Sequence, residues 1–413
     1  KVNDLNSANA HYQKVIQLNP NFPEAYYNLA TNQKKQGLLE KSAKNFRFTI
    51  QIKPDHIEAH NNLANVYLEL DRTDDAVSCF KKALLIEPNN PTASNGLSLA
   101  YLKISKFEKA WPYYAYRDRT HLKPTKLNHI PKNKRWNGTL KTGDSLIIHA
   151  EQGIGDEIFF SRFLVPLNTL ASSQKNKIHV TCDKRLLPLF RRSFPAITFE
   201  DKKLPAQDIF KYEVHLASIA KYFVNSINDC HHYNKPFLKV DLSKASKYRS
   251  RLNSDKKTIC GISWVSAGNT EFAHVKRSIP LVNFSEILRS NNILPLDLQY
   301  GDHETEIAEF FDKSGILIHQ VSDVDNLKDI DSLFSLIAAC DYVVTTANST
   351  AHFAGSIGVK TYQLTPKGTG DFWYWNQLNK DNTSIWYPSI HILRQDIAGD
   401  WTMPLASLRK LLI

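Results

Sequence analysis

The sequence predicts a region of helical repeats followed by two α/β units with parallel sheets. Pro20, Pro54 and Pro88 are spaced 34 residues apart, and similar residues recur between them. Beyond residue 140, short β-rich runs alternate with helical stretches; the runs are SLIIHA, KIHVTC, ITFE, TICGISWV, ILPLDLQY, ILIHQV, DYVVTTA and KTYQLTP. A fixed period indicates repeated structural units, whereas alternation of this kind is typical of parallel sheets covered by helices.

Each repeat is predicted to be a pair of antiparallel helices. The proline ends the second helix, because its ring and missing N–H disrupt helical hydrogen bonding. Alanines at matching positions allow close helix approach, and large apolar residues fill the remaining space: Ala25 and Ala59, Ala30 and Ala64, Ala43 and Ala76, Leu29 and Leu63, and Phe46 and Phe80. This pattern resembles the tetratricopeptide repeat, whose arrays form a concave surface that usually holds a peptide or protein. A packing or dimerisation scaffold is the alternative.

The composition indicates where the domains divide. Residues 1–120 carry the repeats, and residues 1–20 resemble the second half of one, so we expect the sequence to begin inside a longer array. Residues 121–140 are basic, proline-containing and aperiodic, as expected of a linker. We expect one α/β domain at residues 141–255 and another at residues 256–413, separated by the lysine-rich segment DLSKASKYRSRLNSDKK.

Positive charge is concentrated in the middle of the chain. The net charge is +11, and residues 121–256 hold 24 basic against 12 acidic residues. Such a field attracts phosphates, an acidic protein or a membrane surface, although solvated lysine-rich helices would also account for it. No apolar run approaches the ~18 residues of a membrane span. Five scattered cysteines without a CxxC motif favour a reducing cytoplasm over a disulfide framework or a zinc site.

Several motifs that suggest cofactor or metal binding fail on closer reading. GIGDEI has Ile158 where a dinucleotide fingerprint needs its third glycine. The triplets DVD and DID, residues 323–325 and 329–331, precede an apolar helix, where acids cap the helix and interact favourably with its dipole. His231 and His232 have no partner at ligand spacing. We expect no metal cofactor, and no nucleic-acid partner is indicated.

The segment HAEQGIGDEIFFSRFL, residues 149–164, predicts a strand that turns at glycines into a helix. Gln152, Gly153 and Gly155 form the turn. Asp156 begins the helix at the carboxyl end of a strand, where open α/β sheets bind ligands. A carboxylate in this position can take a proton from a substrate hydroxyl. A simple helix cap is the alternative.

Two further segments have side chains suited to phosphate. DYVVTTA is followed by Asn348, Ser349 and Thr350 at the start of a helix, where free N–H groups can hold a phosphate or ribose. After GISWV, a polar loop ends in Arg277 and Ser278, a cation beside a hydroxyl that would suit a diphosphate. An ordinary N-cap and a solvated loop cation are the respective alternatives.

Together these segments resemble bacterial tetratricopeptide proteins whose C-terminal part is similar to the heptosyltransferase-like glycosyltransferases of GT-B fold. The resemblance covers nearly the whole chain and includes WNG at residues 136–138, HAEQGIGD, RSIPL, LQYGD, ANSTAHFAGSIG and the tail WYPSIHILRQDIAGDW. It implies a tetratricopeptide solenoid followed by a GT-B-like pair of Rossmann-type domains. It also implies an inverting, metal-independent transfer from a nucleotide-sugar donor.

The resemblance implies roles for individual residues. Asp156 would be the general base that deprotonates the acceptor hydroxyl, with the turn before it on the acceptor side. The residues implied for donor binding are Arg277, Ser278, Gln299, Gly301, Asn348, Ser349, Thr350 and His352. Asn348 stands where relatives commonly carry Asp, and Tyr374 stands where they often carry Arg. These two departures leave the identity of the donor and the activity open.

Two functions therefore remain. One is an enzyme that moves a sugar to the hydroxyl of an acceptor, either a protein recruited by the repeats or a phosphorylated glycan attracted by the basic middle of the chain. The other is a non-catalytic repeat scaffold whose transferase-like part is inert and binds a protein partner. Asp156 together with Arg277 favours the enzyme, whereas Asn348 and Tyr374 favour the scaffold.

Overall fold

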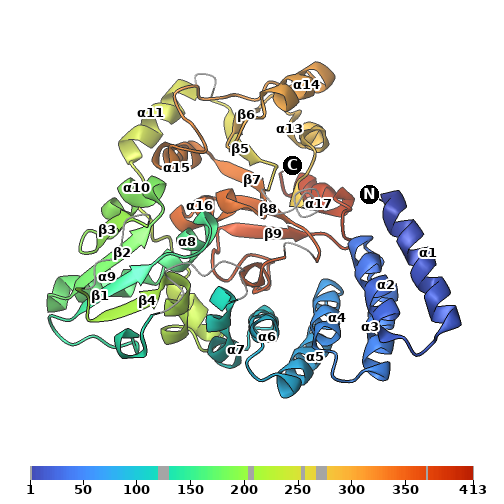
Figure 1. Ribbon diagram of the computed structural model, residues 1–413. Coiled ribbons are helices and arrows are strands. Elements are labelled where there is room, and N and C mark those ends of the chain that lie inside the picture. The colour runs from blue at the N-terminus through green and yellow to red at the C-terminus, as the bar shows by residue number, and fades with distance from the viewer. Residues whose placement is uncertain are drawn as a thin grey trace. The chain divides into compact units, whose positions relative to one another are not determined.

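The computed structural model describes residues 2–119, 130–202, 209–252, 256–266, 277–368 and 371–412. The chain forms two compact units, Lys1–Asn128 and His129–Ile413 (Figure 1). No helix within the described ranges combines the length and apolar character needed to cross a membrane. The architecture is a helical repeat region followed by two parallel-sheet α/β layers, as the sequence predicts.

The first unit is a series of antiparallel helix pairs. Its elements are α1 (Val2–Leu18), α2 (Pro23–Lys35), α3 (Leu39–Ile52), α4 (Ile57–Glu69), α5 (Thr73–Ile86), α6 (Pro91–Lys103), α7 (Phe107–Tyr114) and the 3-10 helix η1 (Ala115–Arg119). Phe46 and Phe80 are fully buried, as are the small residues beside them. Gly96 of α6 is one of these small residues. It lies so close to Phe80 that a Cβ at this position would be 2.3 Å from the ring. Small residues therefore set how closely the helices approach.

A second feature repeats with the same 34-residue period. Gly37, Asp71 and Ser105 each follow the first helix of a pair and adopt left-handed backbone angles, with φ of 77°, 58° and 58°. A left-handed residue ends a helix by satisfying its last carbonyl groups, and glycine adopts it without steric cost. The turn between paired helices is thus the same in each repeat, although only one repeat uses glycine.

The second unit begins with a four-stranded parallel sheet. Its order is β3-β2-β1-β4, with β1 (Ser145–His149), β2 (Lys177–Cys182), β3 (Thr198–Asp201) and β4 (Tyr212–His215). The helical elements of this half are α8 (Ile154–Ser161), α9 (Leu164–Gln174), η4 (Lys184–Leu186), α10 (Leu187–Ser193), η5 (Leu216–Tyr222) and η6 (Asn228–Tyr233). The chain continues to one side of β1 through β2 and to the other side at β4, so the strand order reverses beside β1.

Part of the predicted linker belongs to this sheet. Residues 121–129 lie outside the described residues. Trp136 is buried, its backbone N–H donates to the Glu213 carbonyl of β4 at 3.0 Å, and its ring packs against Tyr222. The 3-10 helix η3 (Lys132–Lys134) precedes it. Residues 130–140 therefore pack on the first sheet rather than spanning freely between domains.

A five-stranded parallel sheet forms the other half of the unit. Its order is β6-β5-β7-β8-β9, with β5 (Thr258–Ser263), β6 (Ile293–Asp297), β7 (Tyr342–Thr346), β8 (Thr361–Thr365) and β9 (Ile390–Arg394). The remaining elements are α11 (Leu242–Leu252), η7 (Leu281–Phe284), α13 (Ser285–Leu288), α14 (Glu304–Ser314), α15 (Ile330–Ala339), α16 (Ser349–Ile357), η8 (Trp373–Trp375) and α17 (Thr402–Leu412). Here the strand order reverses between β5 and β7. The run ILIHQV, predicted as a strand, makes a single β-bridge, His319 with Leu296.

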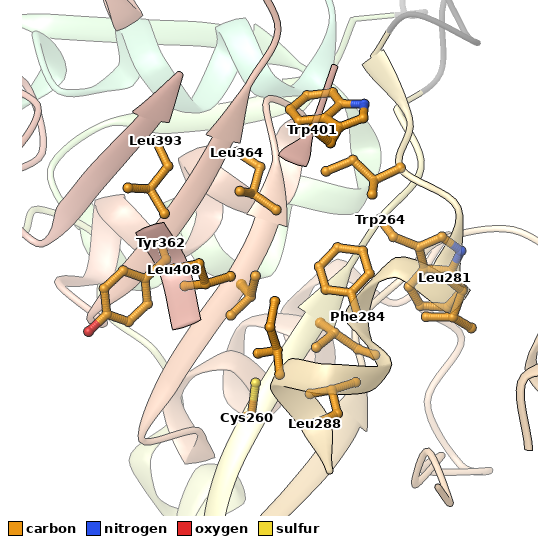
Figure 2. Close-up of a cluster of buried hydrophobic side chains, with 14 of the residues drawn as sticks. Cys260, Trp264, Leu281, Phe284, Leu288, Tyr362, Leu364, Leu393, Trp401 and Leu408 are labelled. Atoms are coloured by element: carbon orange, nitrogen blue, oxygen red, sulfur yellow. The ribbon is translucent and has the colours of Figure 1, made fainter. Parts of the chain in front are cut away.

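A dense apolar cluster fixes this second sheet. Figure 2 shows side chains of β5, β8 and β9 gathered with those of η7, α13 and α17. Its members include Cys260, Tyr362, Leu364, Leu393, Phe284, Leu288 and Leu408. Trp264, directly after β5, is also fully buried there, and its Nε1–H donates to Glu306 at 2.8 Å. The cluster therefore holds the chain rigidly where β5 ends.

Candidate functional site

The carboxyl ends of β1, β5 and β7 open onto one cavity of about 330 Å³. These are the strands beside which the two sheets reverse their order, and open α/β sheets bind ligands at such points. The walls come from both halves of the unit: Gly153, Ile154, Gly155, Asp156, Arg185, Ser266, Arg277, Tyr300, Asn326, Leu327, Ile330, Ala347, Asn348, Ser349, His352, Phe353, Phe372, Tyr374 and Trp375. The topology thus brings together segments that lie far apart in the sequence.

Two helix N-termini meet at this cavity. Helices α8 and α16 pack side by side (Figure 1), and each contributes its first turn to the wall. Gly155 makes the approach possible, because a Cβ there would lie 3.2 Å from Cδ2 of His352 and 3.6 Å from Cα of Ser349. Unpaired N–H groups and the helix dipole give such ends partial positive charge. The convergence favours an anionic ligand.

Asp156 contributes a carboxylate to the cavity from the first turn of α8. Its Oδ1 accepts a hydrogen bond from the Tyr374 hydroxyl at 3.3 Å. The neighbouring Glu157 points away and is 1% exposed. Glu157 pairs with Lys202 at 2.5 Å and accepts from the Asp183 backbone N–H at 2.9 Å, while burial raises its pKa. The two adjacent acids therefore have different roles: Asp156 lines the cavity, whereas Glu157 is buried in contacts with Lys202 and Asp183.

Arg277 contributes a cation to the same cavity. Its guanidinium carbon lies 4.9 Å from the centre of the Phe372 ring, and burial lowers its pKa. Within the described ranges, no carboxylate pairs with it, and its buried Nε has no hydrogen-bond partner. Arg185, also in the wall, differs because Asp183 binds it through two oxygens. Arg277 is thus the better placed of the two to neutralise a bound anion.

Asn348 joins the ends of two strands. Its Oδ1 accepts from the Thr345 hydroxyl and the Thr350 backbone N–H, both at 2.9 Å. Its Nδ2 donates to the Ser263 hydroxyl at 2.8 Å and to the Val265 carbonyl at 3.1 Å. A carboxylate has no hydrogen to donate to these two oxygens. The amide therefore fits this structure at a position where an aspartate was the expected residue.

Five of the predicted residues do not line the cavity. Gln299 is 2% exposed, and its Oε1 accepts from the backbone N–H groups of Trp264 and Val265 at 2.9 and 2.8 Å. The Ser278 hydroxyl accepts from the Ser266 backbone N–H at 3.1 Å. The predicted residues that do not line the cavity are Gln152, Ser278, Gln299, Gly301 and Thr350. Those that do are Gly153, Gly155, Asp156, Arg277, Asn348, Ser349 and His352.

An aromatic wall is the main feature that sequence reasoning missed. Tyr374 stacks between Phe159 and Phe372, with ring centroids 4.6 and 5.5 Å away. Trp375 lies 4.6 Å from His352. Tyr374 belongs to a run of four consecutive aromatic residues, 372–375, and this run was a signal for the wall in addition to the missing arginine. The wall gives a ligand a flat apolar face beside Asp156 and Arg277.

Comparison with known proteins establishes the nature of the first unit. Residues 2–37 match a TPR repeat model, and residues 57–90 match a model described as Tetratricopeptide repeat. The first unit therefore contains tetratricopeptide repeats. Among solved structures, MamA matches with 22% identity and a TM-score of 0.27, covering 27% of this chain and 66% of its own. YrrB, titled as a TPR protein with an unusual peptide-binding site, has 23% identity, a TM-score of 0.24, and coverage of 26% and 54%.

Two similar proteins match over more of the chain than the repeats. Protein FlbA of Caulobacter vibrioides is 28% identical over 313 residues, which cover 71% of this chain and 50% of that protein. The chain thus spans about half the length of this curated relative. ADP-heptose LPS heptosyltransferase II of E. coli has 13% identity and a TM-score of 0.44, with 65% of this chain and 99% of that chain covered.

Proposed function

We propose that the second unit is a glycosyltransferase that moves a sugar from a nucleotide-sugar donor to an acceptor hydroxyl. The observation that carries this proposal is the presence of Asp156 and Arg277 in one cavity, at the points where both sheets reverse. A base and a cation on opposite sides of a reacting carbon are what sugar transfer requires. The two helix N-termini add partial positive charge for the leaving diphosphate.

The proposed reaction inverts the configuration at the sugar. Asp156 takes the proton of the acceptor hydroxyl, whose oxygen then forms a bond to the anomeric carbon. The bond from that carbon to the diphosphate oxygen breaks, and the nucleoside diphosphate leaves with both electrons. Arg277 and the first turn of α16 stabilise the negative charge that develops on it. No metal ion is required, because these groups supply the positive charge.

The repeats are proposed to recruit a protein acceptor. Tetratricopeptide arrays present concave surfaces that suit peptides. A phosphorylated glycan is the alternative acceptor, because residues 121–256 carry 24 basic against 12 acidic residues. The competing function is an inert scaffold. One observation argues against the scaffold. Asn348 and Tyr374, the two departures from the family pattern, both make specific hydrogen bonds, to Ser263 and to Asp156.

Thermal unfolding of the full chain against UDP, GDP, ADP, TDP and CMP tests the proposal. A ligand at ~100 times its Kd stabilises by about 2.7 kcal/mol, which raises the Tm by several degrees. One nucleoside diphosphate is expected to produce this rise and to identify the donor class. If none of the five raises the Tm, the donor site is inert and the scaffold function replaces the enzyme.

A further inference from the structure

His352 contributes an imidazole to the cavity wall, and its side chain is buried among aromatic rings. It lies in the first turn of α16 and is 3% exposed. The rings of Tyr374, Trp375 and Tyr387 lie 5.0, 4.6 and 5.8 Å from its own. Burial and the nearby Arg162 cation hold its pKa well below the usual value. His352 is therefore neutral, and one of its two ring nitrogens carries a hydrogen.

Tyr387 determines which nitrogen that is. Its hydroxyl oxygen lies 3.2 Å from Nδ1 of His352, and Tyr387 is 1% exposed. Among the residues that the structure describes, Nδ1 is the one acceptor that this hydroxyl meets. Leaving a buried hydroxyl without an acceptor costs about 1–3 kcal/mol, so the O–H donates to Nδ1. Nδ1 then has no hydrogen of its own, and Nε2 carries it.

Arg162 packs its guanidinium against the Tyr387 ring. It is 1% exposed, its guanidinium carbon lies 4.3 Å from the centre of the Tyr387 ring, and it opposes the effect of burial on the Tyr387 pKa. Arg162 donates from Nε to the Phe159 carbonyl at 2.8 Å and from Nη1 to the Trp386 carbonyl at 2.9 Å. It is thus anchored to both halves of the unit. Arginine has no hydrogen-bond acceptor, so Arg162 cannot take the hydrogen of the Tyr387 hydroxyl, which remains directed at His352.

We propose that Tyr387, held by Arg162, fixes His352 as the neutral tautomer with its hydrogen on Nε2, so that His352 donates a hydrogen bond to the cavity ligand. The residue is thereby a fixed neutral donor rather than a proton-transfer group. Given the proposed function, on which this last step rests, its acceptor is an oxygen of the donor diphosphate. Tyr387 and Arg162 are positioning residues, because they act through His352.

Nitrogen-15 NMR of the full chain labelled at histidine tests the tautomer without any ligand. The chain has 15 histidines, and the His352→Gln variant assigns the signals. The expected spectrum shows His352 neutral, with hydrogen on Nε2, and unchanged between pH of about 5 and 8, where ordinary histidines titrate. Among the residues that the structure describes, Tyr374, Tyr387 and Arg162 are ionisable or charged groups that face this ring, and Asp156 lies beyond Tyr374. Hydrogen on Nδ1, or protonation within this range, would overturn the proposal.

Tyr387→Phe isolates the contribution of the hydroxyl. We expect the His352 signals to change to a mixture of tautomers. Tyr374→Phe is the matched control, because its ring also lies against His352 while its hydroxyl binds Asp156. That variant should leave the tautomer unchanged. Equal spectra for the wild type and Tyr387→Phe would show that Tyr387 does not determine the tautomer.

Nucleotide binding gives a second readout. For the nucleoside diphosphate that stabilises the wild type, Tyr387→Phe should weaken the Kd by about 2- to 10-fold, the usual value of one hydrogen bond. An unchanged Kd would show that His352 does not donate a hydrogen bond to the diphosphate. If the wild type shows the expected tautomer but binds no nucleotide, the proposed function fails while the role of Tyr387 stands. The two proposals can therefore fail separately.

Discussion

The turns after β1 and β7 have the same pattern, yet their polar side chains do opposite things. Each turn connects a buried strand to a helix that begins at the cavity. After β7, Asn348 caps α16 with its side chain and turns its amide into the protein toward Ser263 and Val265. After β1, the cap residue Gly153 has no side chain to use, and Asp156 lies in the cavity wall. The polar residue at the helix start is thus a structural residue that caps the helix in one turn, whereas it is a candidate catalytic base in the other.

Asp156→Asn should produce the largest effect on the proposed turnover. In the turn after β1 and the start of α8, Asp156 is the acid that lines the cavity, and asparagine cannot accept a proton in its place. The proposed turnover should fall by about 10²- to 10⁴-fold. The nucleotide Kd and the Tm should change little, since the amide matches the carboxylate in shape. A transfer assay with the stabilising nucleotide sugar measures the loss. Turnover equal to the wild type would exclude Asp156 as the base.

Arg277→Gln should weaken nucleoside diphosphate binding by about 10- to 100-fold, the usual range for a hydrogen bond to a charged group. Arg185→Gln is the comparison, because Asp183 already neutralises that cation and has its pKa lowered to about 2 as a result. Its effect on the Kd should be smaller. Isothermal titration calorimetry measures both constants. If Arg185→Gln weakens binding more, the diphosphate lies nearer to the first sheet than we propose.

Asn348→Asp should destabilise the second unit by about 1–3 kcal/mol, because the carboxylate cannot donate to the Val265 carbonyl and removes one of the two donors to the Ser263 hydroxyl. Urea unfolding monitored by tryptophan fluorescence measures the change. Ser349→Ala, the adjacent substitution, should stay within about 0.5 kcal/mol. A stable Asn348→Asp variant with tighter nucleotide binding would show that Asn348 serves the ligand rather than the scaffold.

Gly155→Ala should have the smallest effect, a loss of about 1 kcal/mol in stability with a weaker nucleotide Kd. The added Cβ would press on His352, whose ring is enclosed by other aromatic rings and cannot move aside. Gly153→Ala is the control, because its Cβ would meet nothing closer than Asp156 Oδ2 at 3.9 Å. Equal Tm values for the two variants would show that the helix ends tolerate separation.

Patterns of period and polarity were enough to predict much of the fold. The 34-residue spacing predicts the helix pairs, and the Ala and Phe positions are buried as expected. Asp329 of the DID triplet caps α15, accepting from the Ser332 backbone N–H at 3.1 Å, which confirms the predicted capping role of this residue. The strand predicted at ILIHQV was wrong, because this run pairs with the edge strand β6 through a single bridge at His319. An apolar run becomes a strand only where a neighbour is available along its length.

The sequence by itself determined the repeat period, the alternation of strands and helices, and the chemical types at the site. These follow from local physics: where a helix must end, which face is apolar, and which side chain can accept a proton. Only the tertiary structure decided that Asp156 and Arg277 line one cavity, that Gln299 and Thr350 are buried outside its lining, and that Tyr387 reaches His352. Those contacts join residues from separate strand ends, and their distances depend on sheet order and packing, which no local pattern contains.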